Sequence, residues 1–116
     1  KDFKEKNFEI LQKRPLLASA IISIGMKRQE TEKIPEIEEI AAVACAVQNM
    51  CLIATAYGIG TYWSTGGKTY SDEMKKFLTL SPNDRCLGFL YLGYSAIEWP
   101  KGQRRPIEYF STFLEE

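Results

Sequence analysis

The run from Ile40 to Tyr57 contains no charged residue, and it constrains the fold more than any other part of the chain. Its six alanines favour a helix and allow neighbouring elements to approach closely. Apolar residues occur on every face, so we expect a long helix that is buried on most of its sides. Pro35 fits the first helical turn. The glutamates that follow complement the positive end of the helix dipole: Glu36, Glu38 and Glu39.

The same run is about as long as a membrane span requires. In a bilayer, however, Gln48 and Asn49 would lie near the midplane, and alanine is only weakly hydrophobic. A helix at the centre of a globular protein, packed against a second subunit, explains the same composition. We therefore expect no membrane partner for this chain.

Two apolar runs on either side of the expected helix predict buried strands, one from Leu16 to Met26 and one from Arg85 to Tyr94. Both are short and bounded by turn residues, which favours strands over helices. Gly88, inside the second run, leaves room for a close contact with another segment. The ends of the chain read as a mixed lead-in at residues 3–11 and a short amphipathic tail at residues 107–114.

Composition excludes several functions. The chain has 15 basic and 15 acidic residues, so no general positive field favours nucleic acid as a partner. It has no histidine, which removes serine–histidine catalysis and histidine-bound zinc, and we expect no metal site. Chemistry must then come from carboxylates, backbone donors or a cofactor. The cysteines are expected to be buried free thiols of a cytoplasmic protein: Cys45, Cys51 and Cys86.

The glycine-rich segment from Gly58 to Gly67 is the main candidate for a binding site. Glycines near a helix end permit a sharp reversal, after which Thr61–Trp63 reads as a short strand. Ser64–Gly67 then offers main-chain N–H groups with little side-chain bulk, which suits a flat ligand with polar edges. Ser71 is a good N-cap for a helix expected over Asp72–Leu80.

Two further groups have two interpretations each. The aromatic side chain of Trp63 fits a core position and a ligand site about equally well. The basic group of Lys101, Arg104 and Arg105 reads either as a solvated tail or as a phosphate contact, since arginine matches phosphate oxygens in a bidentate manner.

Taken in order, these segments resemble the FMN-dependent nitroreductase family, and the resemblance covers nearly the whole chain. The spacing is similar to that of a small subgroup of NAD(P)H nitroreductases with tryptophan in the flavin loop. The segments that carry the resemblance are Ile34–Glu38, Ala46–Met50, Ala54–Gly60, Trp63–Gly66 and Gly88–Tyr94.

The resemblance implies an α+β fold with a central, mostly antiparallel sheet flanked by helices, and a long helix at the core of an intertwined homodimer. It implies FMN at the subunit interface and NAD(P)H as co-substrate. The flavin itself would carry the hydride, so no catalytic side chain is expected. The residues expected to contact FMN are Trp63, Ser64, Thr65, Gly66, Arg104 and Arg105.

Within that site the roles differ. Thr65 and Gly66 would donate main-chain hydrogen bonds to the ring, and Trp63 would pack beside it. Arg104 or Arg105 would meet the phosphate. The arginine-rich N-terminal segment that grips FMN in this family has no counterpart here. We therefore expect residues 1–116 to be a single domain that forms the C-terminal portion of a nitroreductase-like fold, within a longer gene product.

The implied function is an oxidoreductase that passes hydride from NAD(P)H to a nitroaromatic, quinone or similar small-molecule acceptor by a ping-pong mechanism. The alternative is a dimeric module of the same fold that binds or sequesters flavin without turnover. A helical partner-binding domain without cofactor is a third interpretation, and it requires both predicted strands to be absent.

Overall fold

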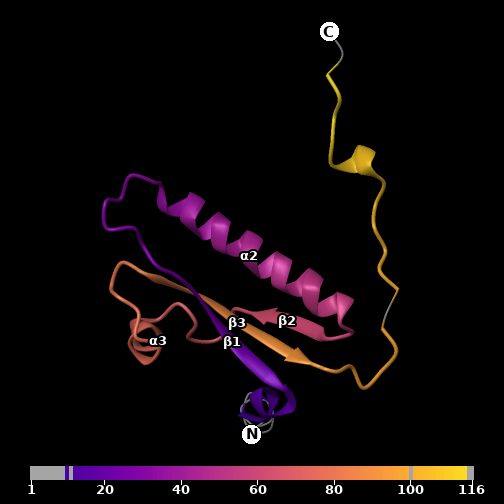
Figure 1. Ribbon diagram of the computed structural model, residues 1–116, viewed down its shortest axis with the longest axis horizontal. Helices are drawn as coiled ribbons and strands as arrows, with labels where there is room; N and C mark the ends of the chain where they lie inside the picture. Colours follow the sequence, from indigo (N-terminus) through magenta and orange to yellow (C-terminus); the bar gives the residue numbers. More distant parts are fainter. Residues whose placement is uncertain (1–9, 11, 100, 115–116) are drawn as a thin grey trace, which may run out of the picture.

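The computed structural model describes residues 10, 12–99 and 101–114. Within them, a three-stranded antiparallel sheet carries a long helix across one face and a short helix beside it (Figure 1). This arrangement confirms the predicted α+β class and rules out an all-helical domain. The elements, in chain order, are η1 Arg14–Leu17, β1 Ala20–Met26, α2 Glu36–Ala56, β2 Gly60–Ser64, α3 Asp72–Phe77, β3 Arg85–Gly93 and η2 Ile107–Tyr109.

The sheet has the strand order β1-β3-β2, so the last strand in the sequence is the central one. Both outer strands run antiparallel to β3. They are therefore parallel to each other, and α2 is the crossover that connects them. Leu92 pairs with Ala20 of β1 and with Thr61 of β2, which fixes the register on both sides.

The core lies between the sheet and α2. Side chains alternate between the two faces of a strand, and β3 buries every second residue from Cys86 to Leu90. Leu90 is completely buried and packs with Ile24 of β1 and Val47 of α2. Partly buried apolar side chains surround these three: Val43, Met50, Cys51, Leu87 and Leu92.

The predicted strand at Leu16–Met26 is wrong in its first part. Pro15 belongs to η1, and β1 begins only at Ala20. Within β1 only Ile24 and Met26 are buried, because β1 is an edge strand and nothing in the described part of the chain covers its first residues. By contrast, the strand predicted at Arg85–Tyr94 is confirmed to within one residue. The lead-in at 3–11 falls, apart from one residue, outside the described residues.

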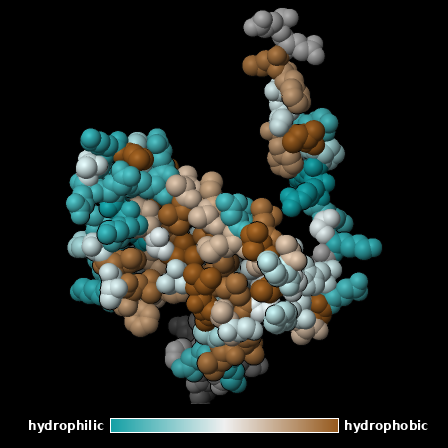
Figure 2. All heavy atoms as spheres, viewed as in Figure 1, coloured by the Kyte–Doolittle hydropathy of each residue, from teal (hydrophilic) through white to brown (hydrophobic). Residues whose placement is uncertain are grey.

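The long helix is confirmed, but the prediction that it is buried on most sides is wrong for the single chain. Its buried residues, Glu39, Val47 and Ala54, form one stripe. Leu52 and Ile53 of the opposite side are 58% and 61% exposed. Figure 2 shows hydrophobic residues gathered over the middle of the molecule, in the area of the helix and the sheet. Likewise, Cys45 of this helix is exposed.

By length and composition, α2 is also a helix that could cross a membrane, the one such helix in the described residues. The core helix of a soluble protein passes the same test. Only a small part of α2 is covered in the single chain, so much of its apolar surface is exposed.

The segment after β2 follows the sequence prediction closely. Gly58 has a φ of +70° and ends α2 with a reversal into β2. The Ser71 side chain caps α3 by accepting a hydrogen bond from the amide of Met74. This helix ends at Phe77, three residues earlier than predicted, and Thr79 follows with a positive φ. The C-terminal tail, expected to be amphipathic, forms a single turn at η2 and runs away from the sheet (Figure 1).

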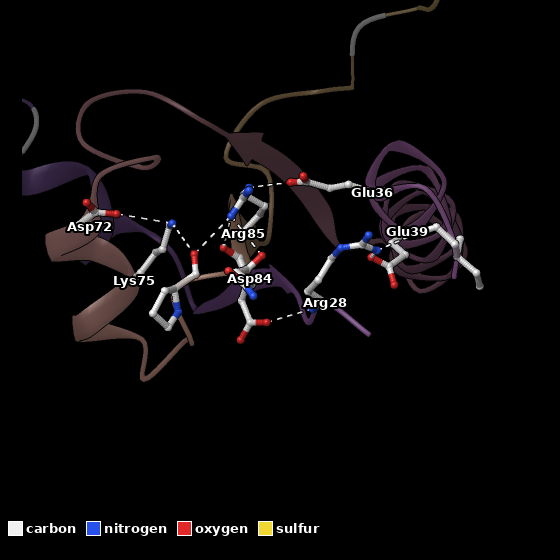
Figure 3. A network of polar contacts seen from close by, with 10 residues as sticks. Arg28, Glu36, Glu39, Asp72, Lys75, Asp84 and Arg85 are labelled. Atoms are coloured by element: carbon white, nitrogen blue, oxygen red, sulfur yellow. Dashed lines mark hydrogen bonds and ion pairs between the residues drawn. The ribbon is translucent and has the colours of Figure 1, made fainter. Parts of the chain in front are cut away.

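A polar network holds the start of α2 against the loop that precedes it (Figure 3). The Arg28 guanidinium forms an ion pair with Glu39 and donates a hydrogen bond to the carbonyl of Ile34 at 2.7 Å. The second carboxylate oxygen of Glu39 accepts from the amide of Gln29 at 3.1 Å. Both side chains of the pair are largely buried, so Glu39 does more than complement the helix dipole.

Asp84 extends this network to the turn before β3 (Figure 3). Its carboxylate accepts hydrogen bonds from the amides of Arg28 at 2.9 Å and Ser81 at 2.8 Å. These two hydrogen bonds, in that order of importance, lower the pKa of Asp84. Nearby, Arg85 and Glu36 form a more exposed ion pair at 2.6 Å.

Candidate functional site

The end of β2 and the loop that connects it to α3 contain four of the six predicted site residues. Trp63 and Ser64 are the last residues of β2, and Thr65 and Gly66 follow directly. Pairing with β3 ends where Ser64 lies opposite Phe89. Past that point, no backbone acceptor in the described residues receives a hydrogen bond from the amides of Gly66 or Gly67. Those amides are therefore free to meet a ligand.

The space beside this main chain is open. A Cβ atom built on Gly66 or on Gly67 would meet no other heavy atom within 4 Å. A flat molecule can therefore approach the peptide planes edge-on without displacing protein atoms. This is an arrangement in which backbone donors, rather than side chains, recognise the polar edge of a ring.

The far end of the loop is fixed by Thr69, a residue that the sequence interpretation did not single out. Its side chain is 2% exposed, and its hydroxyl donates to the carbonyl of Gly66 at 2.7 Å. The amide of Ser71 donates to the carbonyl of Lys68, and Ser71 then caps α3. The sequence gives only a weak signal for this contact. A threonine two residues before an N-cap does not by itself show that the loop folds back to Gly66.

The near end of the loop is fixed by Trp63. The indole Nε1–H donates to the carbonyl of Leu87 in β3 at 2.8 Å. Trp63 is 36% exposed, so the core covers it only in part, and its contact with a ligand stays a prediction. Beside it, Gly88 has a φ of +116°, and the close contact predicted at this glycine is confirmed with Ser64, Trp63 and Thr65.

A groove of about 570 Å³ lies along the same strands. Tyr62 and Tyr91 line it as a cross-strand pair, with ring centroids 6.4 Å apart. By strand alternation these rings lie on the sheet face opposite Leu90, away from the main core. The groove includes Ser64 but none of the other predicted site residues, and most of its lining belongs to the start of β2 and the end of β3, away from the loop.

The first part of the segment that follows the β2 pairing is uncharged. No residue from Trp63 to Gly67 has a titratable side chain, whereas Lys68 and Tyr70 follow further along the loop. The nearest perturbed acid is Glu73 in the first turn of α3, whose pKa is lowered chiefly by a backbone hydrogen bond and then by the Ser71 side chain. Among the described residues, no group of three or more His, Cys, Asp or Glu could hold a metal ion. The segment from Trp63 to Gly67 therefore offers backbone donors, but its side chains supply no acid or base.

The structure does not bring Arg104 and Arg105 to this loop. Both are exposed in the tail, where the Arg105 guanidinium lies over the Tyr109 ring, 5.7 Å from its centroid. The tail leaves the end of β3 at Gly93, opposite the start of β2, whereas the loop follows the other end of β2 (Figure 1). Within one chain the two sets of residues are therefore separate.

Comparison with known proteins connects these features to one family. The profile of the nitroreductase family matches residues 2–94. The chain is 33% identical over 89 residues to the protein named "Putative NAD(P)H nitroreductase YdjA" of Escherichia coli K12, and the match covers 77% of this chain and 49% of that protein. The protein of that name in Escherichia coli O157:H7 matches equally well.

A solved structure shows the same fold. The crystal structure of a nitroreductase-like family protein from Bacillus cereus superimposes with a TM-score of 0.81 at 28% sequence identity. The superposition covers 97% of this chain and 60% of the crystallised one. The chain thus spans about half the length of the curated relatives that it matches.

Proposed function

This chain belongs to the nitroreductase family, and we propose that it is part of a flavin-dependent oxidoreductase with FMN as its cofactor. The reductant is NAD(P)H, and the acceptor is a nitroaromatic, a quinone or a similar small molecule. The single observation that carries the proposal is the open loop after β2, where the amides of Gly66 and Gly67 have no backbone acceptor. The matched family and relative support the same chemistry.

The residues present fit the polar edge of a flavin. FMN, when bound, supplies two-electron hydride chemistry that no side chain here provides. The main-chain amides of Thr65 and Gly66 would hold the ring edge, with Trp63 and Ser64 bordering it. Since no residue from Trp63 to Gly67 has a titratable side chain, the role of this segment is to orient the ring and exclude water. Two substrates that use one position in turn would give ping-pong kinetics.

The proposed partner is a second copy of the chain. The apolar side of α2 that the single chain leaves exposed, with Leu52 and Ile53, fits a helix interface between two protomers. The tail adds more exposed hydrophobic side chains, namely Ile97, Trp99, Ile107, Phe110, Phe113 and Leu114. In a homodimer this tail can reach the partner protomer, which is how Arg104 or Arg105 would come close to an FMN phosphate.

The test compares Gly66→Val with Lys33→Val, an exposed residue of the loop before α2, in the full-length protein. An added Cβ at Gly66 meets nothing within 4 Å, so the fold accepts the change. We expect Gly66→Val to lose bound FMN, measured by flavin absorbance per protomer, while Lys33→Val retains it. Full FMN content in Gly66→Val would refute the loop assignment.

Turnover separates the enzyme from a flavin-sequestering module. We expect NAD(P)H to bleach the yellow protein under anaerobic conditions and a nitroarene or quinone to restore its colour. A flavin that stays oxidised after NAD(P)H is added would favour the non-catalytic module of the same fold.

A further inference from the structure

The central strand contains a β-bulge beside the candidate loop. Ile24 of β1 pairs with Gly88, but the next residue, Gly25, pairs with Cys86. Leu87 is therefore the extra residue on β3, without a partner in the register of β1. Bulges of this kind redirect a strand and terminate pairing, often next to functional sites.

The bulge and the loop are connected by Trp63. The carbonyl of Leu87, the bulged residue, accepts the indole N–H of Trp63 at 2.8 Å. The pairing of β2 with β3 stops one residue beyond the bulge, at Phe89 and Ser64. The indole hydrogen bond therefore joins β2 to β3 at the place where the pairing of these strands ends and the open loop begins.

Gly88 makes this geometry possible. Its φ of +116° is rarely adopted by residues with a side chain. An added Cβ would clash with the Ser64 carbonyl oxygen, lie 2.9 Å from the Trp63 Nε1 and lie 3.1 Å from the Thr65 methyl group. Three consecutive residues of the β2 end and the loop thus rest directly on the backbone of Gly88.

We propose that Trp63 is a positioning residue, which acts through its indole N–H on the Leu87–Gly88 bulge to set the direction of the loop amides. The inference deepens the proposed function, because one of those amides, that of Gly66, is assigned to the flavin edge together with that of Thr65. It differs from the simpler role in which the Trp63 ring packs against the flavin. The two roles separate chemically, since phenylalanine keeps an aromatic ring but has no N–H donor.

The first experiment needs no flavin. NMR order parameters of the backbone N–H groups are measured at Gly66 and Gly67 in the FMN-free full-length protein, with the buried Val47 of α2 as the internal reference. We expect values near those of a rigid backbone, about 0.85, in the unmodified protein and values below about 0.6 at the two glycines in Trp63→Phe and Trp63→Leu, with Val47 unchanged. Trp99→Phe, in the exposed tail, is the control for tryptophan loss and should leave the order parameters of both glycines unchanged.

The second experiment measures FMN. For a positioning role, Trp63→Phe and Trp63→Leu weaken FMN binding equally, by about tenfold, and shift the visible spectrum of the bound flavin. If Trp63→Phe binds FMN as tightly as the unmodified protein while Trp63→Leu does not, the ring packs on the flavin and the positioning role is overturned. Unchanged order parameters at Gly66 and Gly67 in Trp63→Phe would overturn it as well.

The two proposals fail in different ways. If the unmodified full-length protein binds no FMN, the proposed function fails, but the order-parameter experiment still decides whether Trp63 positions the loop. Gly88→Ala is a second route to the same question, since the added methyl group would displace both the Ser64 carbonyl and the Trp63 indole N–H. We expect it to lower the order parameters of the same two glycines at least as much as Trp63→Phe does.

Discussion

The ion pair between Arg28 and Glu39 gives a quantitative test of the fold. Glu39→Gln preserves the side-chain shape but removes the charge. The carboxylate accepts hydrogen bonds from both Arg28 and the Gln29 amide, whereas glutamine offers only one oxygen, so one donor loses its acceptor. Arg28 would keep the Ile34 carbonyl but lose its counter-charge, with its side chain only 13% exposed.

The expected cost follows from these contacts. Losing one hydrogen bond to a charged group costs about 1.5–3 kcal/mol, and removing one partner of a buried ion pair costs about 3–5 kcal/mol in total. We expect Glu39→Gln to lower the free energy of unfolding by about 3 kcal/mol. The melting temperature should fall by roughly 10–20 °C. Urea unfolding at fixed protein concentration measures the change directly.

Glu36→Gln is the matched control. Glu36 lies in the same first turn of α2, so loss of the favourable helix-dipole interaction is common to both variants. Its partner Arg85 is more exposed, and we expect a cost of about 0–1 kcal/mol. If the two variants unfold within about 0.5 kcal/mol of each other, burial does not strengthen the Arg28–Glu39 pair and the reasoning is refuted. The double variant Arg28→Met/Glu39→Leu should recover much of the lost stability.

Three further changes test other parts of the fold. Leu90→Ala empties the completely buried centre of the core and should cost about 2–5 kcal/mol in urea unfolding; a cost below 1 kcal/mol would contradict the packing described. Ser71→Ala removes the α3 cap and should cost about 1 kcal/mol, while no change would mean that the Met74 amide finds another acceptor. Because the pKa of Asp84 is lowered on folding, its charged carboxylate stabilises the protein above its ordinary pKa, near pH 4, and this contribution is lost as pH falls through the lowered value. Urea midpoints of the unmodified protein and Asp84→Asn should therefore differ most near neutral pH and converge in acid; a pH-independent difference would exclude a role for the charge.

Local signals were the most predictable part of this chain. The alanine-rich run specified α2, the apolar run before Tyr94 specified β3, and Ser71 specified the start of α3, because each signal lies within the element that it determines. The loop residues from Trp63 to Gly66 were also located correctly in space, at the end of a strand. Their contact with FMN stays a prediction, as does the assignment of residues 1–116 to a single domain.

Long-range partners were less predictable. Sequence alone assigned Glu39 to the helix dipole, because nothing local shows that Arg28 folds back onto it from the preceding loop. The bulge at Leu87 is equally hidden, although an isolated glycine in a strand hints at one. The prediction that α2 is buried on most sides was wrong for the single chain. Among the described residues, only the stripe with Glu39, Val47 and Ala54 is buried.

The position of β3 at the centre of the sheet has a consequence for synthesis on the ribosome. Among the described residues, β3 is the strand that pairs with β1 and with β2, so neither has a neighbour in this sheet until residues 85–93 have emerged. Until then the described part of the nascent chain exposes unpaired strand edges and an apolar helix, features that favour aggregation. β3 thus completes the sheet late in synthesis, after both of the strands that it joins.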